Sequence, residues 1–370
     1  MINSEKINDY IDQYLNGRPF EVAPATFVSE KSKAKQLKKI FKNRLLKEIR
    51  HSDIHEQITR LHKQHYKNKT INEFLIILRA VFHRAELDGV IERNPMSGIS
   101  NFAIDIPSPD PFTKTELAQL HKTDVACING KNASELNSLT GVRIGELLAL
   151  AWEDVDWERK ELYINRAKVL QQYKAPKTPG SIRVVELNDL ALKILREQYA
   201  LTGKRRARKI SVLKSDNKST EQQTLHFMFY NSKTNQPFLH AAQFNKDFFT
   251  PFLKQAGVKH RGVGQLRHTF ASQCLTAGIS KEWIATQMGH TGTHMIDLHY
   301  GRWIKADAPD CARAVMTHLA DVFGEAVTPP AKPSISSGES IYPELLVLMK
   351  SLQSRPELLA LIQGVVGGVS

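Results

Sequence analysis

The amino-acid sequence predicts a mainly α-helical protein with a small antiparallel β-sheet, divided between a helical N-terminal domain and a mixed C-terminal domain. Three observations lead to this prediction. Apolar residues recur at helical spacing through the first hundred positions, a proline-rich run crosses residues 106–111, and two strand-like segments follow that run. With 370 residues the chain is long enough for two such domains.

The N-terminal part is expected to consist of a short segment, 1–28, and a helical domain, 29–105. Residues 31–50 hold nine basic residues against Glu48 alone, with apolar residues interleaved at helical spacing. This pattern predicts a basic amphipathic helix, whose charges either face solvent or contact a polyanion. A second apolar stripe runs from Ile71 to Ala85 and predicts a helix that ends before Gly89.

The run Ile106-Pro-Ser-Pro-Asp-Pro111 cannot continue a helix and is expected to be a linker. Thr113 and Glu116 then form a capping-box pattern that opens the second domain, 112–323. Its expected strands are 161–166 and 182–187, joined through a turn, and the polar insert 203–222 is expected to be a loop. Expected helices cover 114–121, 133–139, 144–151, 188–199, 240–256, 266–277, 281–288 and 307–323. The remainder, 324–370, is expected to be a Pro/Ser-rich linker followed by a helical tail.

The composition favours a polyanionic partner. The formal net charge is +13, which points first to nucleic acid and second to an anionic membrane surface. No apolar run approaches the ~20 residues of a membrane-spanning helix. Three scattered cysteines are too few for a disulfide framework or a zinc site and suit a reducing cytoplasm, so no metal or other cofactor is expected.

Four separated stretches each carry an Arg, Lys, His or Tyr in a distinctive setting. They are Thr140-Gly-Val-Arg-Ile-Gly-Glu146, Lys177-Thr-Pro-Gly-Ser-Ile-Arg183, Gly264-Gln-Leu-Arg-His-Thr-Phe-Ala271, and Met288-Gly-His290 followed by Tyr300-Gly-Arg-Trp303. In this order they resemble the catalytic domain of the tyrosine recombinases, the phage-integrase family, and temperate-phage integrases in particular. The spacing of ten residues from His290 to Tyr300 fits the family pattern, and 72–95 resembles the end of its helical core-binding domain.

The resemblance implies a core-type DNA-binding domain followed by a DNA breaking-rejoining catalytic domain. It assigns the catalytic roles to Arg143, Lys177, Arg267, His290 and the nucleophile Tyr300. It also makes the basic block the candidate DNA-contacting surface, with Lys31, Lys35, Lys38, Lys39, Lys42 and Arg44 as the candidate residues.

The chemistry of strand exchange explains these residue types. A tyrosine hydroxyl attacks phosphorus and stores the bond energy as a 3′-phosphotyrosyl ester, so neither ATP nor a metal is needed. Arg143 and Arg267 would bind the non-bridging oxygens, and His290 would hydrogen-bond the phosphate or help to deprotonate Tyr300. Lys177 would protonate the leaving 5′-oxygen. Lys174 and Lys168 compete for that role, since hairpin motifs are loosely specified.

The chain departs from the family pattern at Gly264, where relatives place a histidine three residues before the second arginine. Removing one general acid–base group typically costs about 10²–10⁴ in rate. We expect activity to be retained, with His268, His260 or a water taking that place.

The resemblance also implies partners: double-stranded attachment sites, a homotetramer on DNA with a Holliday-junction intermediate, and an excisionase or a host DNA-bending protein. It places the protein in the cytoplasm of a bacterial host, at the nucleoid, with no membrane partner. The acidic residues 1–30 are too few for an additional arm-type domain. Two alternatives stay open, a catalytically impaired DNA-binding regulator on the same scaffold and a type IB topoisomerase-like enzyme.

Overall fold

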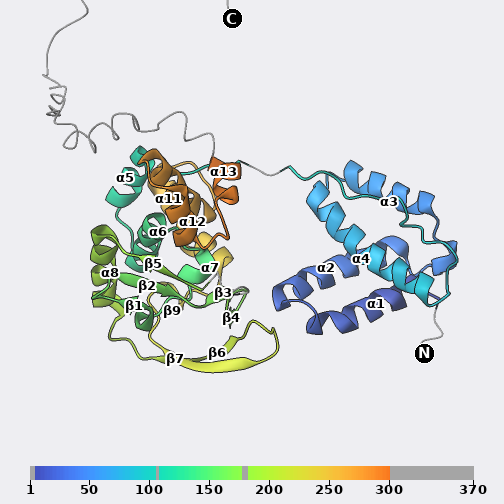
Figure 1. Ribbon diagram of the computed structural model, residues 1–370, viewed down its shortest axis with the longest axis horizontal. Coiled ribbons are helices and arrows are strands. Elements are labelled where there is room, and N and C mark those ends of the chain that lie inside the picture. Colours follow the sequence, from blue (N-terminus) through green and yellow to red (C-terminus); the bar gives the residue numbers. More distant parts are fainter. Residues whose placement is uncertain (1–4, 106–107, 177–181, 301–370) are drawn as a thin grey trace, which may run out of the picture. The chain divides into compact units, whose positions relative to one another are not determined.

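The computed structural model describes residues 5–105, 108–176 and 182–300. Within these ranges the chain forms an N-terminal helical domain and a mixed C-terminal domain (Figure 1). Each domain has a hydrophobic core of its own. The prediction of a mainly helical chain that begins with a helical domain is confirmed. Lys177 and the predicted helix 307–323 lie outside the described residues, as does the tail 324–370.

The helical domain contains four α-helices, α1 (Ile7–Gly17), α2 (Pro24–Phe41), α3 (His51–Lys63) and α4 (Asn68–Leu87). The stripe predicted on α4 is buried, from Ile71 through Phe74 to Ala85. Gly89, which follows this helix, has φ +70°, a conformation that glycine adopts without steric cost. The predicted helix and its end are therefore confirmed.

The expected boundary at residue 29 is wrong, because α1 belongs to the helical domain. Ile7, Tyr10 and Ile11 are buried in the same cluster as Leu37 of α2 and Phe74 of α4. Of the acidic residues in the first thirty positions, Asp12 is exposed on α1, and Glu30 on α2 pairs with Arg18 at 2.6 Å.

The basic block is also shorter as a helix than its composition predicts. Helix α2 ends at Phe41, and Lys42 and Asn43 both have positive φ, 49° and 60°. The left-handed turn lets the backbone N–H of Lys42 bond the carbonyl of Lys38 and breaks the helical run. Residues 44–50 form a connection that contains the short 3₁₀ helix η2 (Leu46–Glu48).

The second domain contains most of the predicted helices. Helix α5 (Lys114–Lys122) opens with the expected capping box, since Thr113 Oγ1 accepts from the N–H of Glu116 and the N–H of Thr113 donates to Glu116 Oε2 at 2.8 Å. The others are α6 (Ile128–Thr140), α7 (Ile144–Leu147), α8 (Asp189–Thr202), α9 (Ala241–Phe244), α10 (Thr250–Gln255), α11 (Gly264–Thr276), α12 (Lys281–Met288) and α13 (His294–Tyr300). A π-helical turn (Asn245–Phe249) joins α9 to α10, and η3 (Trp152–Asp154) precedes the first strand.

The two predicted strands pair antiparallel as β2 (Glu161–Ile164) and β5 (Arg183–Glu186), with Leu162 opposite Val185. Together with β1 (Val155–Asp156) they form a three-stranded sheet in the order β1-β2-β5. The prediction of a simple turn between β2 and β5 is wrong. Two further strands, β3 (Ala167–Val169) and β4 (Gln172–Lys174), lie between them in the chain and belong to a second sheet.

The prediction of a loop at 203–222 is wrong as well. This segment contains β6 (Arg208–Leu213) and the start of β7 (Thr220–Leu225), which pair as a hairpin on the second sheet, ordered β3-β4-β6-β7. Strand β6 runs parallel to β4, so the sheets are not purely antiparallel. Val212 and Leu213 are buried, whereas most of β7 is polar and exposed, which hid the strand in the sequence. A two-stranded pair, β8 (Tyr230–Asn231) and β9 (Gln236–Pro237), completes the strands of the described residues.

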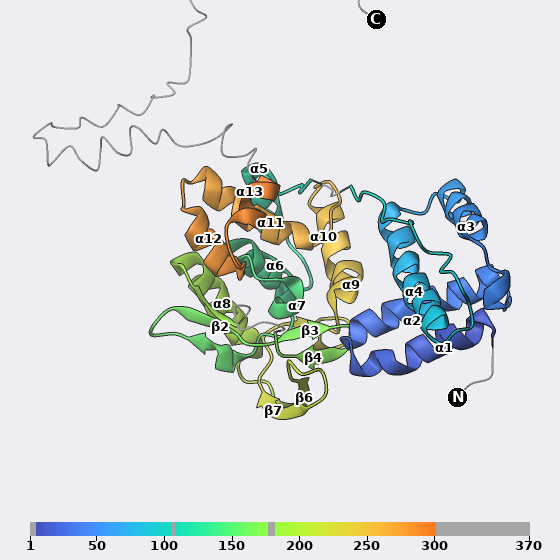
Figure 2. The ribbon, with the colours of Figure 1, turned by 45° about the vertical axis from the view of Figure 1, so that its right-hand side comes forward.

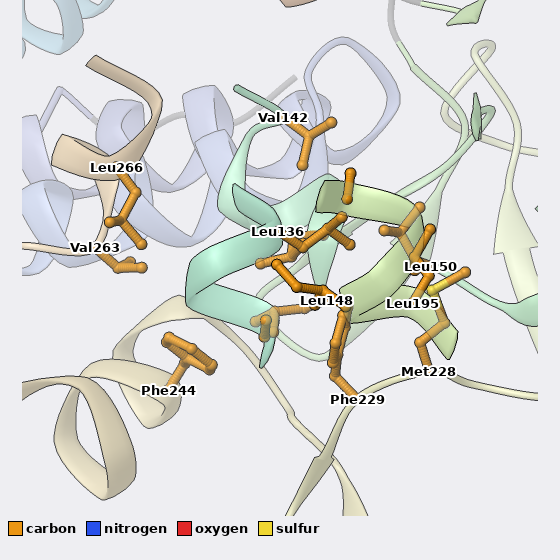
Figure 3. Close-up of a cluster of buried hydrophobic side chains, with 14 of the residues drawn as sticks. Leu136, Val142, Leu148, Leu150, Leu195, Met228, Phe229, Phe244, Val263 and Leu266 are labelled. Carbon is orange, nitrogen blue, oxygen red and sulfur yellow. The ribbon is translucent and has the colours of Figure 1, made fainter. Parts of the chain in front are cut away.

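Helices from distant parts of the chain surround the main core of the second domain (Figure 2). Leu136 of α6, Leu195 of α8, Phe244 of α9 and Leu266 of α11 all contribute to the cluster in Figure 3. Val142 joins the same cluster and is fully buried. The residues beside Arg143 and Arg267 are thus anchored in one core, which fixes the backbone positions of both arginines.

None of the helices in the described part of the chain is both long and apolar enough to cross a membrane.

We predict that Ile11→Ala lowers the free energy of unfolding by about 2–5 kcal/mol, the usual cost of such a truncation in a core. Ile76→Ala is the control, because Ile76 on α4 is 49% exposed and its truncation should have little effect. Urea unfolding of the full chain, followed by circular dichroism, measures both. Equal midpoints for the two variants would show that α1 is not part of the core.

Candidate active site

Arg143 lies at the start of a helix that follows a sharp turn. Gly141 ends α6 with φ +62°, and a Cβ there would lie 2.3 Å from the ring of Phe270. Arg143 is then the N-cap of α7 and donates from its backbone to Glu146 Oε2 at 2.9 Å and from Nη1 to Glu146 Oε1 at 3.0 Å. The two side chains thus form an ion pair. The Arg143 side chain stays 44% exposed, so its guanidinium is accessible to a ligand.

Arg267 projects from α11 and is nearly buried. Its Nη1 donates to the carbonyl of Gly141 at 2.6 Å, and its Nη2 donates to the carbonyl of Met288 at 2.7 Å. Burial, followed by the charge of Arg143, lowers the pKa of Arg267. A guanidinium still keeps its charge at neutral pH, so two cations lie close together here.

His290 follows α12, whose C-cap Gly289 has φ +67°. Its Nε2 lies 2.8 Å from Arg267 Nη2. Arginine only donates, so Nε2 must accept and the ring proton is assigned to Nδ1. Burial, with the charge of Arg267 next, lowers the pKa of His290 to about 4, which keeps the ring neutral at pH 7. The buried Nδ1 carries this proton but has no hydrogen-bond acceptor among the described residues.

Three arginines converge on the C-terminal end of α12. Arg183 Nε donates to the carbonyl of Gln287 at 2.7 Å, Arg267 Nη2 to that of Met288 at 2.7 Å, and Arg143 Nη2 to that of Gly289 at 3.3 Å. The last carbonyls of a helix lack partners within the helix and carry partial negative charge. The helix end thus gathers cations from α7, α11 and β5 at one place.

Sequence reasoning placed Arg183 in a strand and gave it no role in the site. In the structure its side chain is 5% exposed, and Nη2 donates to Glu146 Oε2 at 2.8 Å. Burial alone would raise the pKa of Glu146, but the hydrogen bond and charge of Arg183, with the contacts of Arg143, lower it. Glu146 is therefore a carboxylate shared by two arginines. The sequence feature that could have indicated a role for Arg183 is its position as the last residue of the motif that begins at Lys177.

Tyr300 ends α13 and is 1% exposed. It packs in a small cluster with residues such as Phe270 and Ile296, and its hydroxyl forms a short contact with Nδ1 of His268, the residue after Arg267. Burial raises the pKa of Tyr300, and burial followed by the charge of His299 lowers that of His268 to about 4. A neutral His268 accepts at Nδ1, so the hydroxyl of Tyr300 donates to it.

Gly264 is the first residue of α11, one turn before Arg267. It is exposed, and a Cβ built there meets no other atom within 4 Å. The two histidines that were expected to compensate are engaged elsewhere, His268 with Tyr300 and His260 with Thr250 Oγ1 at 3.2 Å. The position therefore has open space for the Cβ of a larger residue.

Among the competing lysines, Lys168 is buried on β3. It donates to Tyr173 Oη and to the carbonyl of Phe238, both at 2.9 Å, and burial followed by the charge of Arg208 lowers its pKa to about 8. These contacts give Lys168 a structural role. Lys174 is half-buried on β4, and Lys177 lies outside the described residues.

The basic residues expected to contact DNA differ in their surroundings. Lys31, Lys35 and Lys39 are exposed on α2, and Lys42 is exposed just after it. Lys38 pairs with Asp12 at 2.5 Å, and Arg44 pairs with Asp53 at 3.2 Å. Charges already paired with a carboxylate attract a phosphate less, so the four exposed lysines are the better candidates.

No group of three or more metal-ligating side chains occurs among the residues that the structure describes.

A model of the phage integrase family matches residues 112–303, and a model of the phage integrase SAM-like domain matches residues 6–104. The chain belongs to the phage integrase family. This confirms the resemblance drawn from the four motifs. The second match begins where α1 begins, in agreement with the place of α1 in the helical core.

Two curated relatives come from Escherichia coli (strain K12). The prophage integrase IntR is 34% identical over 240 residues, which are 64% of this chain and 58% of IntR. The putative defective protein IntQ is 34% identical over 259 residues, 68% of this chain and 64% of IntQ. The chain thus matches less than two thirds of the length of either relative.

Solved structures show the same fold. The Tn1549 transposon integrase in complex with a circular intermediate DNA matches with a TM-score of 0.65 at 20% identity, covering 86% of this chain and 100% of that one. A lambda integrase tetramer bound to a Holliday junction matches with a TM-score of 0.62 at 17% identity, covering 84% of this chain and 80% of that one.

We predict that the two site histidines make stability depend on pH. Both have pKa values of about 4 in the folded chain, below the usual value of roughly 6.5. The unfolded chain therefore binds more protons, and the stability from these two groups is lost as pH falls from about 6.5 to about 4. The double variant His268→Gln, His290→Gln should flatten a plot of Tm against pH between about pH 7 and pH 5.

His294→Gln serves as the control for this experiment, because His294 is exposed. Its Tm should follow the wild-type curve. An unchanged slope in the double variant would contradict the prediction.

Proposed function

We propose that this protein is a site-specific tyrosine recombinase that integrates or excises a mobile element such as a prophage. The observation that carries the proposal is the convergence of Arg143, Arg267 and His290 at the end of α12, with the buried Tyr300 on the next helix. The cations suit a phosphodiester, and a tyrosine is the nucleophile that stores its energy.

The proposed reaction exchanges one ester for another. The Tyr300 oxygen bonds to phosphorus as its proton passes to water, and the bond from phosphorus to the 5′-oxygen breaks. Lys177 gives that oxygen a proton, which leaves a 3′-phosphotyrosyl ester and a free 5′-hydroxyl. Attack by another 5′-hydroxyl reverses these steps, so the strands are rejoined without hydrolysis.

We assign the catalytic roles of the side chains from their positions and exposure. Arg143, the more exposed arginine, and Arg267 would neutralise the charge that builds on the non-bridging oxygens. His290 would donate its Nδ1–H to the same phosphate once that buried atom becomes accessible. Tyr300 must first leave its contact with His268, because a buried hydroxyl with a raised pKa is a poor nucleophile.

The partners follow from the same proposal. Double-stranded attachment sites would bind between a core-binding domain and the catalytic domain, with Lys31, Lys35, Lys39 and Lys42 contacting phosphates and Lys38 and Arg44 contributing less. We propose a homotetramer on DNA in the cytoplasm of a bacterial host, with an excisionase or a DNA-bending protein as further partners. The tail 324–370 would contact a neighbouring protomer or another protein.

The two features that favour a second function are Gly264 and the buried Tyr300. Both suit a DNA-binding regulator on the same scaffold, which binds the attachment site without cutting it.

We predict that wild-type protein forms a denaturant-resistant adduct with a nicked duplex carrying the element's own attachment site. Tyr300→Phe should bind this duplex with unchanged affinity and form no adduct, because only the nucleophilic oxygen is missing. Denaturing gel electrophoresis measures the adduct, and a binding titration measures affinity. Binding by wild type without an adduct would favour the regulator, and an adduct in Tyr300→Phe would exclude Tyr300 as the nucleophile.

We further predict that Gly264→His folds normally, because a Cβ at residue 264 meets no other atom within 4 Å, and cleaves faster by up to about 10²-fold, because the imidazole would supply the missing acid–base group. Gly264→Ala is the matched control, since it adds a Cβ at the same helical position without the imidazole. Single-turnover cleavage of the nicked duplex compares the three proteins. Equal rates for the alanine and histidine variants would mean that the missing histidine does not limit cleavage.

A further inference from the structure

Arg183 is a buried arginine to which the four catalytic motifs assign no role. It begins β5, where it pairs with Ile164 of β2, and its side chain is 5% exposed. A buried guanidinium costs free energy unless its charge and its donors are satisfied. The groups that accept its hydrogen bonds therefore indicate which parts of the site it stabilises.

Among the described residues, hydrogen-bond acceptors of Arg183 lie on two other elements of the site. Nε donates to the carbonyl of Gln287 in the last turn of α12, and Nη2 donates to Oε2 of Glu146 on α7. Glu146 in turn holds the backbone and the guanidinium of Arg143. A second link runs from the same strand, because the N–H of Glu186 donates to Gln287 Oε1 at 2.9 Å.

The turn after α12 is shaped around Arg183. A Cβ on Gly289 would lie 2.9 Å from Cδ and 3.0 Å from Nη1 of Arg183, so a larger residue has no room there. The φ of +67° at Gly289 also favours glycine. The next residue is His290. The side chain of Arg183 thus fixes the path of the chain directly before the histidine that contacts Arg267.

We propose that Arg183 is a positioning residue of the strand-transfer centre, joining the carboxylate that holds Arg143 to the helix end that presents His290. It acts through Glu146 and the α12 terminus and not on the phosphate, because its guanidinium is buried. The inference rests on the proposed recombinase function for its effect on cleavage, but its structural part can be tested without DNA.

A matched control is available in the same domain. Arg166 is equally buried, with 4% of its side chain exposed, and pairs with the buried carboxylate of Asp154 while its Nε donates to the carbonyl of Ala149 at 3.0 Å. Its partners are not those of the α12 terminus. Replacing either arginine by lysine keeps a charge but loses the planar, two-sided set of donors. Comparing the two lysine variants therefore distinguishes a loss of stability from a loss of positioning.

The first experiment compares Arg183→Lys with Arg166→Lys in the full chain. Single-turnover cleavage of the nicked attachment-site duplex is measured at a temperature where both variants are folded by circular dichroism. Arg183→Lys should cleave roughly 10²-fold more slowly than Arg166→Lys, because small misplacements of catalytic groups have effects of this size. Affinity for the duplex should be the same in both variants.

The second experiment titrates His290 by NMR in the free protein, with its signal assigned from His290→Asn. The charged and titratable groups that act on His290 are Arg267, Arg143, Arg183 and His299. Arg183→Met removes one cation and loosens the turn, so the pKa of His290 should rise by roughly one unit. Arg166→Met should leave that pKa unchanged.

Equal cleavage by the two lysine variants, or an unshifted His290 in Arg183→Met, would overturn the proposal. If wild type itself forms no adduct, the recombinase function fails, and the titration still tests whether Arg183 acts on His290 in the free protein.

Discussion

Three successive carbonyls at the C-terminal end of α12 accept hydrogen bonds from Arg183, Arg267 and Arg143, and the rest of the site is arranged around them. Like charges repel when they are brought together in a partly buried place. The partial negative charge of the helix end, with the carboxylate of Glu146, offsets that repulsion. The cations are therefore in place before any phosphate arrives, which is the preorganisation that electrostatic catalysis requires.

The same arrangement indicates how a phosphate would enter. Arg143 is the most exposed of the three arginines, and its bond to Gly289 is the longest at 3.3 Å. It would therefore turn to a ligand at the lowest cost, while Arg183 stays buried on its partners. The nucleophile is held back, since Tyr300 is buried against His268. Moving α13 would then be a separate step from assembling the phosphate site.

The sequence predicted what depends on residue type and local spacing, and it missed what depends on distant contacts. Arg143, Arg267, His290 and Tyr300 stand in motifs with recognisable neighbours, so they were found as candidates. Arg183 was not found, because its role depends on a hydrogen bond to the carbonyl of Gln287, about a hundred positions later. The hairpin of β6 and β7 was missed because one face is polar, and the end of α2 was missed because two consecutive residues with positive φ break a run that still looks helical.

The most direct test of this account is a crystal structure of the Tyr300→Phe protein bound to its nicked attachment-site duplex. We predict that the scissile phosphate lies between Arg143, Arg267 and Nδ1 of His290, with Arg183 still bonded to Glu146 and to the carbonyl of Gln287. A phosphate bound away from the end of α12, or an Arg183 side chain turned to the DNA, would contradict it.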